Sequence, residues 1–143
     1  MARYRATVRS RRTAQDTFEY LSDFSTTAEW DPGVVEAERT TTGPVGIDST
    51  FRVVASFLGR RVPLVYRVVE FEAGRRVVLR ADAPTLCSID EITVVPTDGG
   101  SEVTYDADLR GRGILRLADP LLGLAFRRIG DRALDGLVRA LAA

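Results

Sequence analysis

Apolar and polar residues alternate along five short runs between residues 51 and 109, and segments containing Gly, Pro or Asp separate these runs. Alternation of this kind predicts β-strands with one buried and one solvated face, and the separating segments predict turns. We expect the turns at Gly59-Arg60, Ala73-Gly74, residues 83–85 and residues 98–100. The region therefore predicts five antiparallel strands that share one apolar face.

Placing the turns in this way fixes which residues face each other across each hairpin. The predicted pairs are Phe57 with Val62, Ala55 with Leu64, Val53 with Tyr66 and Phe51 with Val68 in the first hairpin, Val68 with Leu79 and Glu70 with Val77 in the second, and Val94 with Tyr105, Ile92 with Ala107 and Asp90 with Leu109 in the last. In this register the opposite face collects charges of both signs, from Arg52, Arg67, Arg80, Glu91, Asp106, Asp108 and Arg110. Mixed charges are typical of a solvated face, so we interpret it as exposed rather than as an anion site.

Shorter elements are predicted before the five strands. An alternating strand at residues 4–8 is followed by a helix that Thr13 caps and that ends near Ser22. A second short helix is expected from Ser25, its capping residue, and Asp-Pro-Gly then stops it. Residues 34–42 predict a more polar strand.

The last part of the chain predicts one long amphipathic helix. Asp119-Pro120 is a typical helix start, and the helix is expected to end near Leu141. Its apolar residues recur at helical spacing and form a single stripe of Leu122, Phe126, Ile129, Ala133, Leu137 and Leu141. The chain thus predicts an α+β fold, in which a curved antiparallel sheet of about seven strands wraps around the C-terminal helix and two short helices follow the first strand.

A curved sheet lifts away from a helix that lies across it, and an apolar hollow in such a place is typical of a ligand pocket. The residues expected to line it are Phe51, Val53, Phe57, Leu64, Val68, Leu79, Ile92 and Leu109 from the sheet, Leu122, Phe126 and Ile129 from the long helix, and Trp30 from the end of the second short helix. The polar groups expected on the same face are Tyr66, Tyr105, Asp90, Ser88 and Glu70, of which Glu70 lies near a turn and is expected to be solvated. The alternative is a fully packed core in which the tyrosine hydroxyls bond locally; periodicity supports both equally.

Composition narrows the range of functions. The 143 residues, of which 45% are hydrophobic, predict one domain over residues 1–143. The 20 basic residues are all Arg, which suggests a GC-rich bacterial genome, and 20 acidic residues balance them, so we expect no nucleic-acid partner. The chain has no His, which excludes His-based acid–base catalysis, and its single Cys87 provides no disulfide. Neither a signal peptide nor a membrane-spanning run is visible, so a cytoplasmic location is expected.

Asp90 is the leading candidate for chemistry. If it faces the cavity, burial raises the pKa of its carboxyl and suits it to proton transfer or to holding a ligand hydroxyl. The alternative is a bulge that turns Asp90 to solvent. Tyr66 and Tyr105 are candidate hydrogen-bond donors to a ligand carbonyl, or plain lining residues. Trp30 is expected to pack near one end of the cavity, as a structural residue or as a wall for a ligand.

The order of elements resembles that of the helix-grip superfamily, which includes START lipid-transfer domains and polyketide cyclase/dehydrase-type proteins. The segments that carry the resemblance are Trp30–Val34, the hairpin at Gly59–Arg61, the stretch Val94–Tyr105 and the entry to the last helix at Leu117–Leu122. The resemblance covers nearly the whole chain and implies a cavity for lipids, polyketides or other apolar molecules. It supplies no common catalytic motif, and the lack of His departs from cyclase-like mechanisms that use one.

Three functions are consistent with these observations. The first is binding of a hydrophobic small molecule without catalysis; we favour binding of such a molecule and leave catalysis open. The second is a cofactor-free polyketide cyclase or dehydratase that uses Asp90 as a base and Tyr66 or Tyr105 as an acid. The third is a protein-interaction module of the same superfamily. We expect no cofactor, no metal and no stable membrane insertion, and a monomer or a homodimer.

Overall fold

The computed structural model describes residues 2–57, 59–112 and 119–142. In chain order its elements are β1 (Ala2–Ser10), α1 (Ala14–Ser22), the 3₁₀ helix η1 (Phe24–Thr26), α2 (Thr27–Trp30), β2 (Val34–Arg39), β3 (Thr50–Phe57), β4 (Arg60–Glu72), β5 (Arg76–Asp82), β6 (Leu86–Thr97), β7 (Gly100–Gly111) and α3 (Asp119–Ala142). The five predicted strands between residues 51 and 109 and the long C-terminal helix are confirmed.

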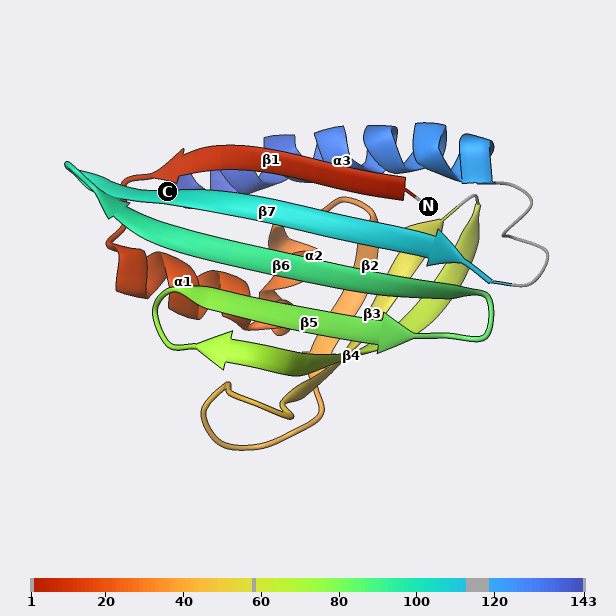
Figure 1. Cartoon of the computed structure of the whole chain (residues 1–143), viewed down its shortest axis with the longest axis horizontal. Helices are drawn as coiled ribbons and strands as arrows, with labels where there is room; N and C mark the ends of the chain where they lie inside the picture. Colours follow the sequence, from red (N-terminus) through yellow and green to blue (C-terminus); the bar gives the residue numbers. More distant parts are fainter. Residues whose placement is uncertain (1, 58, 113–118, 143) are drawn as a thin grey trace.

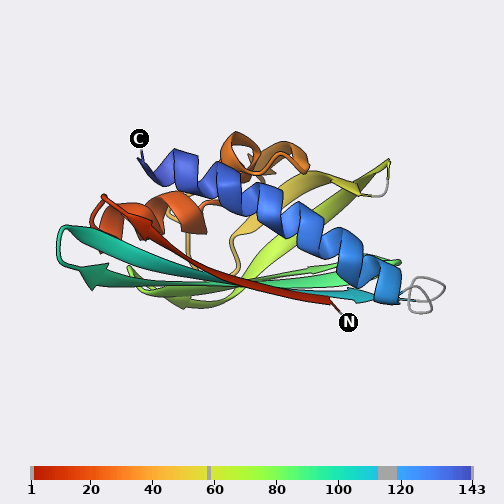
Figure 2. The ribbon, with the colours of Figure 1, turned by 90° about the horizontal axis from the view of Figure 1, so that it is seen from above.

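The described strands form one antiparallel sheet in the order β1-β7-β6-β5-β4-β3-β2 (Figure 1). All the helices lie on one side of this sheet, and the β2–β3 end bends up beside α3 (Figure 2). This is the predicted helix-grip architecture, with α3 held in the concave face. Every helix within the described ranges is too short or too polar to span a bilayer.

The predicted registers of the first and last hairpins are wrong by two residues. Phe51 pairs with Tyr66 rather than Val68, and Asp90 pairs with Ala107 rather than Leu109. In the last hairpin Gly99 alone takes the left-handed turn conformation, with φ 86°, so that the strand resumes at the next residue. Because side chains alternate with a period of two, a shift of this size leaves every side chain on its predicted face.

A bulge changes the second hairpin. Val68 faces Leu79 as predicted, but the register then shifts, and Glu70 faces Val78 instead of Val77. The extra residue in β4 turns Glu70 outward, where its carboxylate pairs with Arg76 at 3.0 Å. Glu70 therefore does not belong to the polar groups of the concave face.

The short elements near the N-terminus begin with two side-chain caps. The Oγ1 atom of Thr13 accepts from the backbone N–H of Asp16 at 3.1 Å, as predicted for α1. The predicted capping role of Ser25 is wrong: Asp23 caps η1 by accepting from the Ser25 N–H at 3.0 Å. Strand β2 also ends at Arg39, before the expected residue 42.

Two glycines of α3 mark close contacts with the rest of the molecule. A Cβ atom added at Gly136 would overlap the carbonyl oxygen of Trp30, and one added at Gly130 would lie 2.5 Å from the ring of Tyr4. At Gly123 a Cβ would meet no other atom within 4 Å. Helix α3 is therefore fixed against α2 and β1 along its second half.

Candidate functional site

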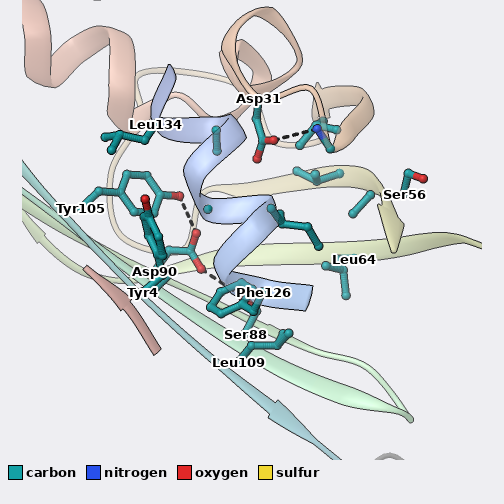
Figure 3. A pocket seen from close by; sticks show the side chains of 18 of the residues that line it. Tyr4, Asp31, Ser56, Leu64, Ser88, Asp90, Tyr105, Leu109, Phe126 and Leu134 are labelled. Atoms are coloured by element: carbon teal, nitrogen blue, oxygen red, sulfur yellow. Dashed lines mark hydrogen bonds between the residues drawn. The ribbon is translucent and has the colours of Figure 1, made fainter. Parts of the chain in front are cut away.

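A cavity of about 140 Å³ lies between the concave face of the sheet and α3 (Figure 3). Its wall is mainly apolar and comes from β1, the segment 30–34, β3, β4, β6, β7 and α3. For comparison, an engineered apolar cavity of about 150 Å³ holds one benzene molecule. The cavity therefore has about the size of a single ring.

Nine of the predicted site residues meet at this cavity. They are Trp30, Val53, Leu64, Tyr66, Asp90, Tyr105, Leu109, Phe126 and Ile129. The side chains of Phe57 and Leu122, also predicted to line it, lie outside the described part of the structure.

Four other predicted lining residues lie elsewhere, in the packed part of the core: Phe51, Val68, Leu79 and Ile92, each with no exposed surface. The reason is that η1 fills that part of the concave face, where the ring of Phe24 lies 6.2 Å from that of Phe51 and 5.1 Å from that of Tyr66. Helix α1 adds the buried Phe18 and Leu21 to the same core. The concave face is thus divided into a packed part and a hollow part.

A chain of hydrogen bonds crosses the sheet beneath the cavity. The hydroxyl of Tyr66 donates to Ser88 Oγ at 3.0 Å, and Ser88 donates to Asp90 Oδ1 at 3.0 Å. The hydroxyl of Tyr105 donates to the other oxygen, Asp90 Oδ2, at 2.5 Å (Figure 3). The three strands β4, β6 and β7 therefore hold one carboxyl group between a tyrosine and a serine.

Asp90 is 7% exposed and faces the concave side of the sheet. The pKa of its carboxyl is raised to about 6, mainly by burial and slightly by the charge of Asp31, against the hydrogen bonds from Tyr105 and Ser88, which favour the ionised form. Burial also raises the pKa of Tyr105 and of Tyr66 well above the ordinary value, so both remain hydroxyl donors near neutral pH.

A second carboxyl group at the cavity, that of Asp31, was missed in the sequence, where Asp-Pro-Gly was interpreted only as a helix stop. Its Oδ1 atom accepts from the N–H of Gly33 at 2.8 Å, and its other oxygen points toward the cavity (Figure 3). Burial raises the pKa of Asp31 to about 6, while the Gly33 hydrogen bond lowers it. In the sequence, only the apolar residues near Asp31 could have indicated that it is buried, and this is a weak signal.

Trp30 closes the cavity between α2 and the sheet. It is 5% exposed, and its ring lies edge-on to Tyr105 with the ring centres 5.9 Å apart. Its indole N–H is buried and finds no hydrogen-bond acceptor among the described residues. The backbone of Trp30 is also the surface against which Gly136 packs.

The chemistry available at this cavity is that of carboxyl groups and hydroxyl groups. In the part of the chain that the structure describes, no three acidic or thiol side chains come together as metal ligands would. Asp90 has the pKa of a group that gains or loses a proton near neutral pH, and Tyr105 is a donor beside it. The remaining wall offers apolar and aromatic contact.

Comparison with known proteins gives a family model and a set of similar folds. The family model described as polyketide cyclase/dehydrase and lipid transport matches residues 1–142. A START superfamily protein from Mycobacterium smegmatis is similar with a TM-score of 0.80 at 13% identity, covering 99% of this chain and 97% of that one. The Zhui aromatase/cyclase from Streptomyces sp. R1128 is similar with a TM-score of 0.79 at 16% identity, covering 97% and 92%.

The di-domain ARO/CYC BexL from the BE-7585A biosynthetic pathway has a TM-score of 0.72 at 14% identity, covering 99% of this chain and 50% of that one. No curated protein matches the sequence. At these identities the similar structures establish the fold alone.

Proposed function

Because the chain belongs to the polyketide cyclase/dehydrase and lipid transport family, we propose that it binds a small hydrophobic molecule between its sheet and α3. The observation that carries the proposal is the cavity of about 140 Å³ with a mainly apolar wall. An apolar hollow with a few convergent polar groups is the usual form of a small-molecule site. The proposed contacts are apolar ones from Phe126, Ile129 and Leu109 and polar ones from Asp90 and Tyr105.

The size of the cavity supports a compact ligand. Drug-sized ligands occupy pockets of roughly 300–1,000 Å³, which is more than this cavity offers. A long acyl chain or an extended polyketide would require α3 to move away from the sheet. We therefore propose a ligand with one ring as the best fit.

Native mass spectrometry of the protein purified from its own host tests this proposal. We expect a small bound compound that is lost from Ala133→Leu, because Ala133 lines the cavity on α3 and the larger side chain fills the space. Val138→Leu is the matched control, since Val138 is 47% exposed on the same helix and is not among the cavity residues. The absence of any bound compound, together with equal binding of 2-phenylethanol by wild type and Ala133→Leu, contradicts the proposal.

A second candidate function, cofactor-free proton transfer of the cyclase or dehydratase type, is favoured by the Asp90–Tyr105 pair. A carboxyl with a pKa of about 6 beside a hydroxyl donor is suited to remove a proton next to a carbonyl while Tyr105 stabilises the developing oxyanion. Asp90→Asn separates the two functions: turnover lost with binding retained supports catalysis, and unchanged binding without any turnover in wild type supports a carrier.

A further inference from the structure

The ionisable side chains at the cavity are all acidic. Those among the described lining residues are the carboxyl groups of Asp31 and Asp90 and the hydroxyl groups of Tyr4, Tyr66 and Tyr105. All basic residues of the chain are Arg, and within the described ranges no Arg belongs to the wall. The residues of α3 that line this cavity are apolar or Gly. Asp31 also borders a second hollow between α2 and α3, whose wall includes Glu29 and Arg139.

Neither carboxyl group has a cationic partner among the described residues. The two oxygens of Asp90 accept from the neutral hydroxyls of Ser88 and Tyr105. One oxygen of Asp31 accepts from a backbone N–H, and no hydrogen bond from the described residues reaches the oxygen that points toward the cavity. A buried negative charge without a cation is unfavourable, and the raised pKa of both groups reflects this.

Aromatic rings surround the same space. Trp30 and Tyr105 stand edge to face at 5.9 Å, and Tyr4, Tyr66 and Phe126 complete the wall. Aromatic faces attract organic cations, and a nearby carboxylate adds to that attraction. A protonated amine could therefore make cation–π contacts with the rings and ion pairs with the carboxylates.

We propose that the ligand is a small organic cation, an amine attached to one ring, whose ammonium group lies between Asp31 and Asp90. The proposal rests on the binding function proposed above and specifies its ligand class. The ring would occupy the apolar space below α3, which has the volume for one. An anionic ligand such as a fatty acid is disfavoured, because its carboxylate would meet two like charges.

Three probes of similar size test the charge preference: phenethylamine, 2-phenylethanol and phenylacetate. At pH 8 both carboxyl groups are ionised, since their pKa values are about 6. Isothermal titration calorimetry is expected to show the amine binding roughly ten-fold or more tighter than the alcohol, as a charged hydrogen bond would produce, and the acid binding more weakly than the alcohol.

Proton release provides a second readout that needs no variant. At pH 6 the two carboxyl groups are partly protonated, and an ammonium ion lowers their pKa. Binding of phenethylamine is therefore expected to release protons, detected as a binding enthalpy that depends on the ionisation enthalpy of the buffer. Binding of 2-phenylethanol is expected to release none.

The double variant Asp31→Asn/Asp90→Asn is expected to bind the amine no more tightly than the alcohol. Glu38→Gln, an exposed carboxylate on β2, is the matched control and is expected to keep the preference. Equal binding of amine and alcohol by wild type, tighter binding of the acid, or a preference that survives the double variant overturns the cation proposal while leaving the cavity function intact. Failure of wild type to bind any of the three probes overturns both.

Discussion

At the scale of single residues, Asp90 links the proposed chemistry to the stability of the fold. Its carboxyl is buried, and its pKa in the folded protein is about 6, against about 4 for an unfolded chain. The folded state therefore holds more protons than the unfolded state between about pH 4 and 6. Stability is expected to fall as the pH rises through this window and to stay lower above it.

Asp90→Asn tests this relation. The variant keeps a side chain of the same shape but carries no charge. Its amide oxygen accepts one of the two hydrogen bonds, and its NH₂ group donates to the other hydroxyl oxygen. The free energy of unfolding at pH 8 is therefore expected to rise by about 1–3 kcal/mol. Urea unfolding at pH 5 and pH 8 measures this free energy. Its difference between the two pH values should be smaller in the variant than in wild type. The pKa of Asp31 is also raised, so its ionisation lowers the free energy of unfolding over the same pH range. The pKa of Asp82 is lowered to about 2 by Arg80, so this group changes stability only below about pH 4. A variant that is less stable at both pH values would contradict the assignment.

Tyr105→Phe is expected to raise the pKa of Asp90 above 6. The variant removes a hydrogen bond that favours the ionised carboxylate, while burial is unchanged. Carbon-13 NMR of the Asp90 carboxyl measures the change. Tyr66→Phe is the matched control because Tyr66 donates to Ser88 and reaches Asp90 only through it. Equal shifts in the two variants would argue against a special role for Tyr105.

The sequence indicated Asp90 but not Asp31, and the reason is local. Asp90 lies in a strand, where alternation assigns each side chain to a face even when the register is off by two. Asp31 lies in a connection, where no periodicity exists and Asp-Pro-Gly is typical of a turn. Only the packing of α2 against α3 brings this carboxyl to the cavity.

At the scale of elements, glycines allow α3 to approach α2 and β1 closely and so fix its position. Gly136→Ala is expected to destabilise the fold by about 2–3 kcal/mol, because the new Cβ overlaps backbone of α2 that has no rotamer to change. Gly123→Ala is expected to stabilise by up to about 1 kcal/mol, since it meets no neighbour and Ala favours a helix. Gly130→Ala should lie between them, because its new Cβ would meet the side chain of Tyr4 and not backbone. Thermal unfolding orders the three variants, and equal effects at Gly136 and Gly123 would refute the packing explanation.

The positions of the turns limited what could be predicted for the hairpins. Adjacent residues such as Gly99 and Gly100 suit a turn equally well by composition, and only the backbone decides which takes the left-handed conformation. The bulge after Val68 coincides with a change of phase in the apolar pattern, from Leu64, Tyr66 and Val68 to Val69 and Phe71, whereas the predicted pairing continued the alternation to Glu70. Strand number, strand order along the chain and the face assignments outside this bulge were predictable because they depend on alternation alone.

At the scale of the whole molecule, the concave face serves two purposes. Helix α1 and η1 fill one part with Phe18, Leu21 and Phe24, which makes a rigid core. Helix α3 covers the other part without filling it, which leaves the cavity. The apolar pattern of the strands is the same in both parts, so the sequence could not distinguish lining residues from core residues such as Leu79 and Ile92.

Two phenylalanines test this division. Phe24 is 2% exposed and packs against Phe51 and Tyr66, so Phe24→Ala is expected to cost about 3–5 kcal/mol by leaving an empty space in the core. Phe126 is half-buried and already borders a hollow, so Phe126→Ala is expected to cost clearly less in urea unfolding. The same variant enlarges the cavity and should bind a two-ring probe such as 2-naphthylethanol more tightly than wild type, whereas Phe24→Ala should not. If both variants gained affinity for the larger probe, the packed and hollow parts would form one continuous space, and the cavity could not by itself select a ligand with one ring.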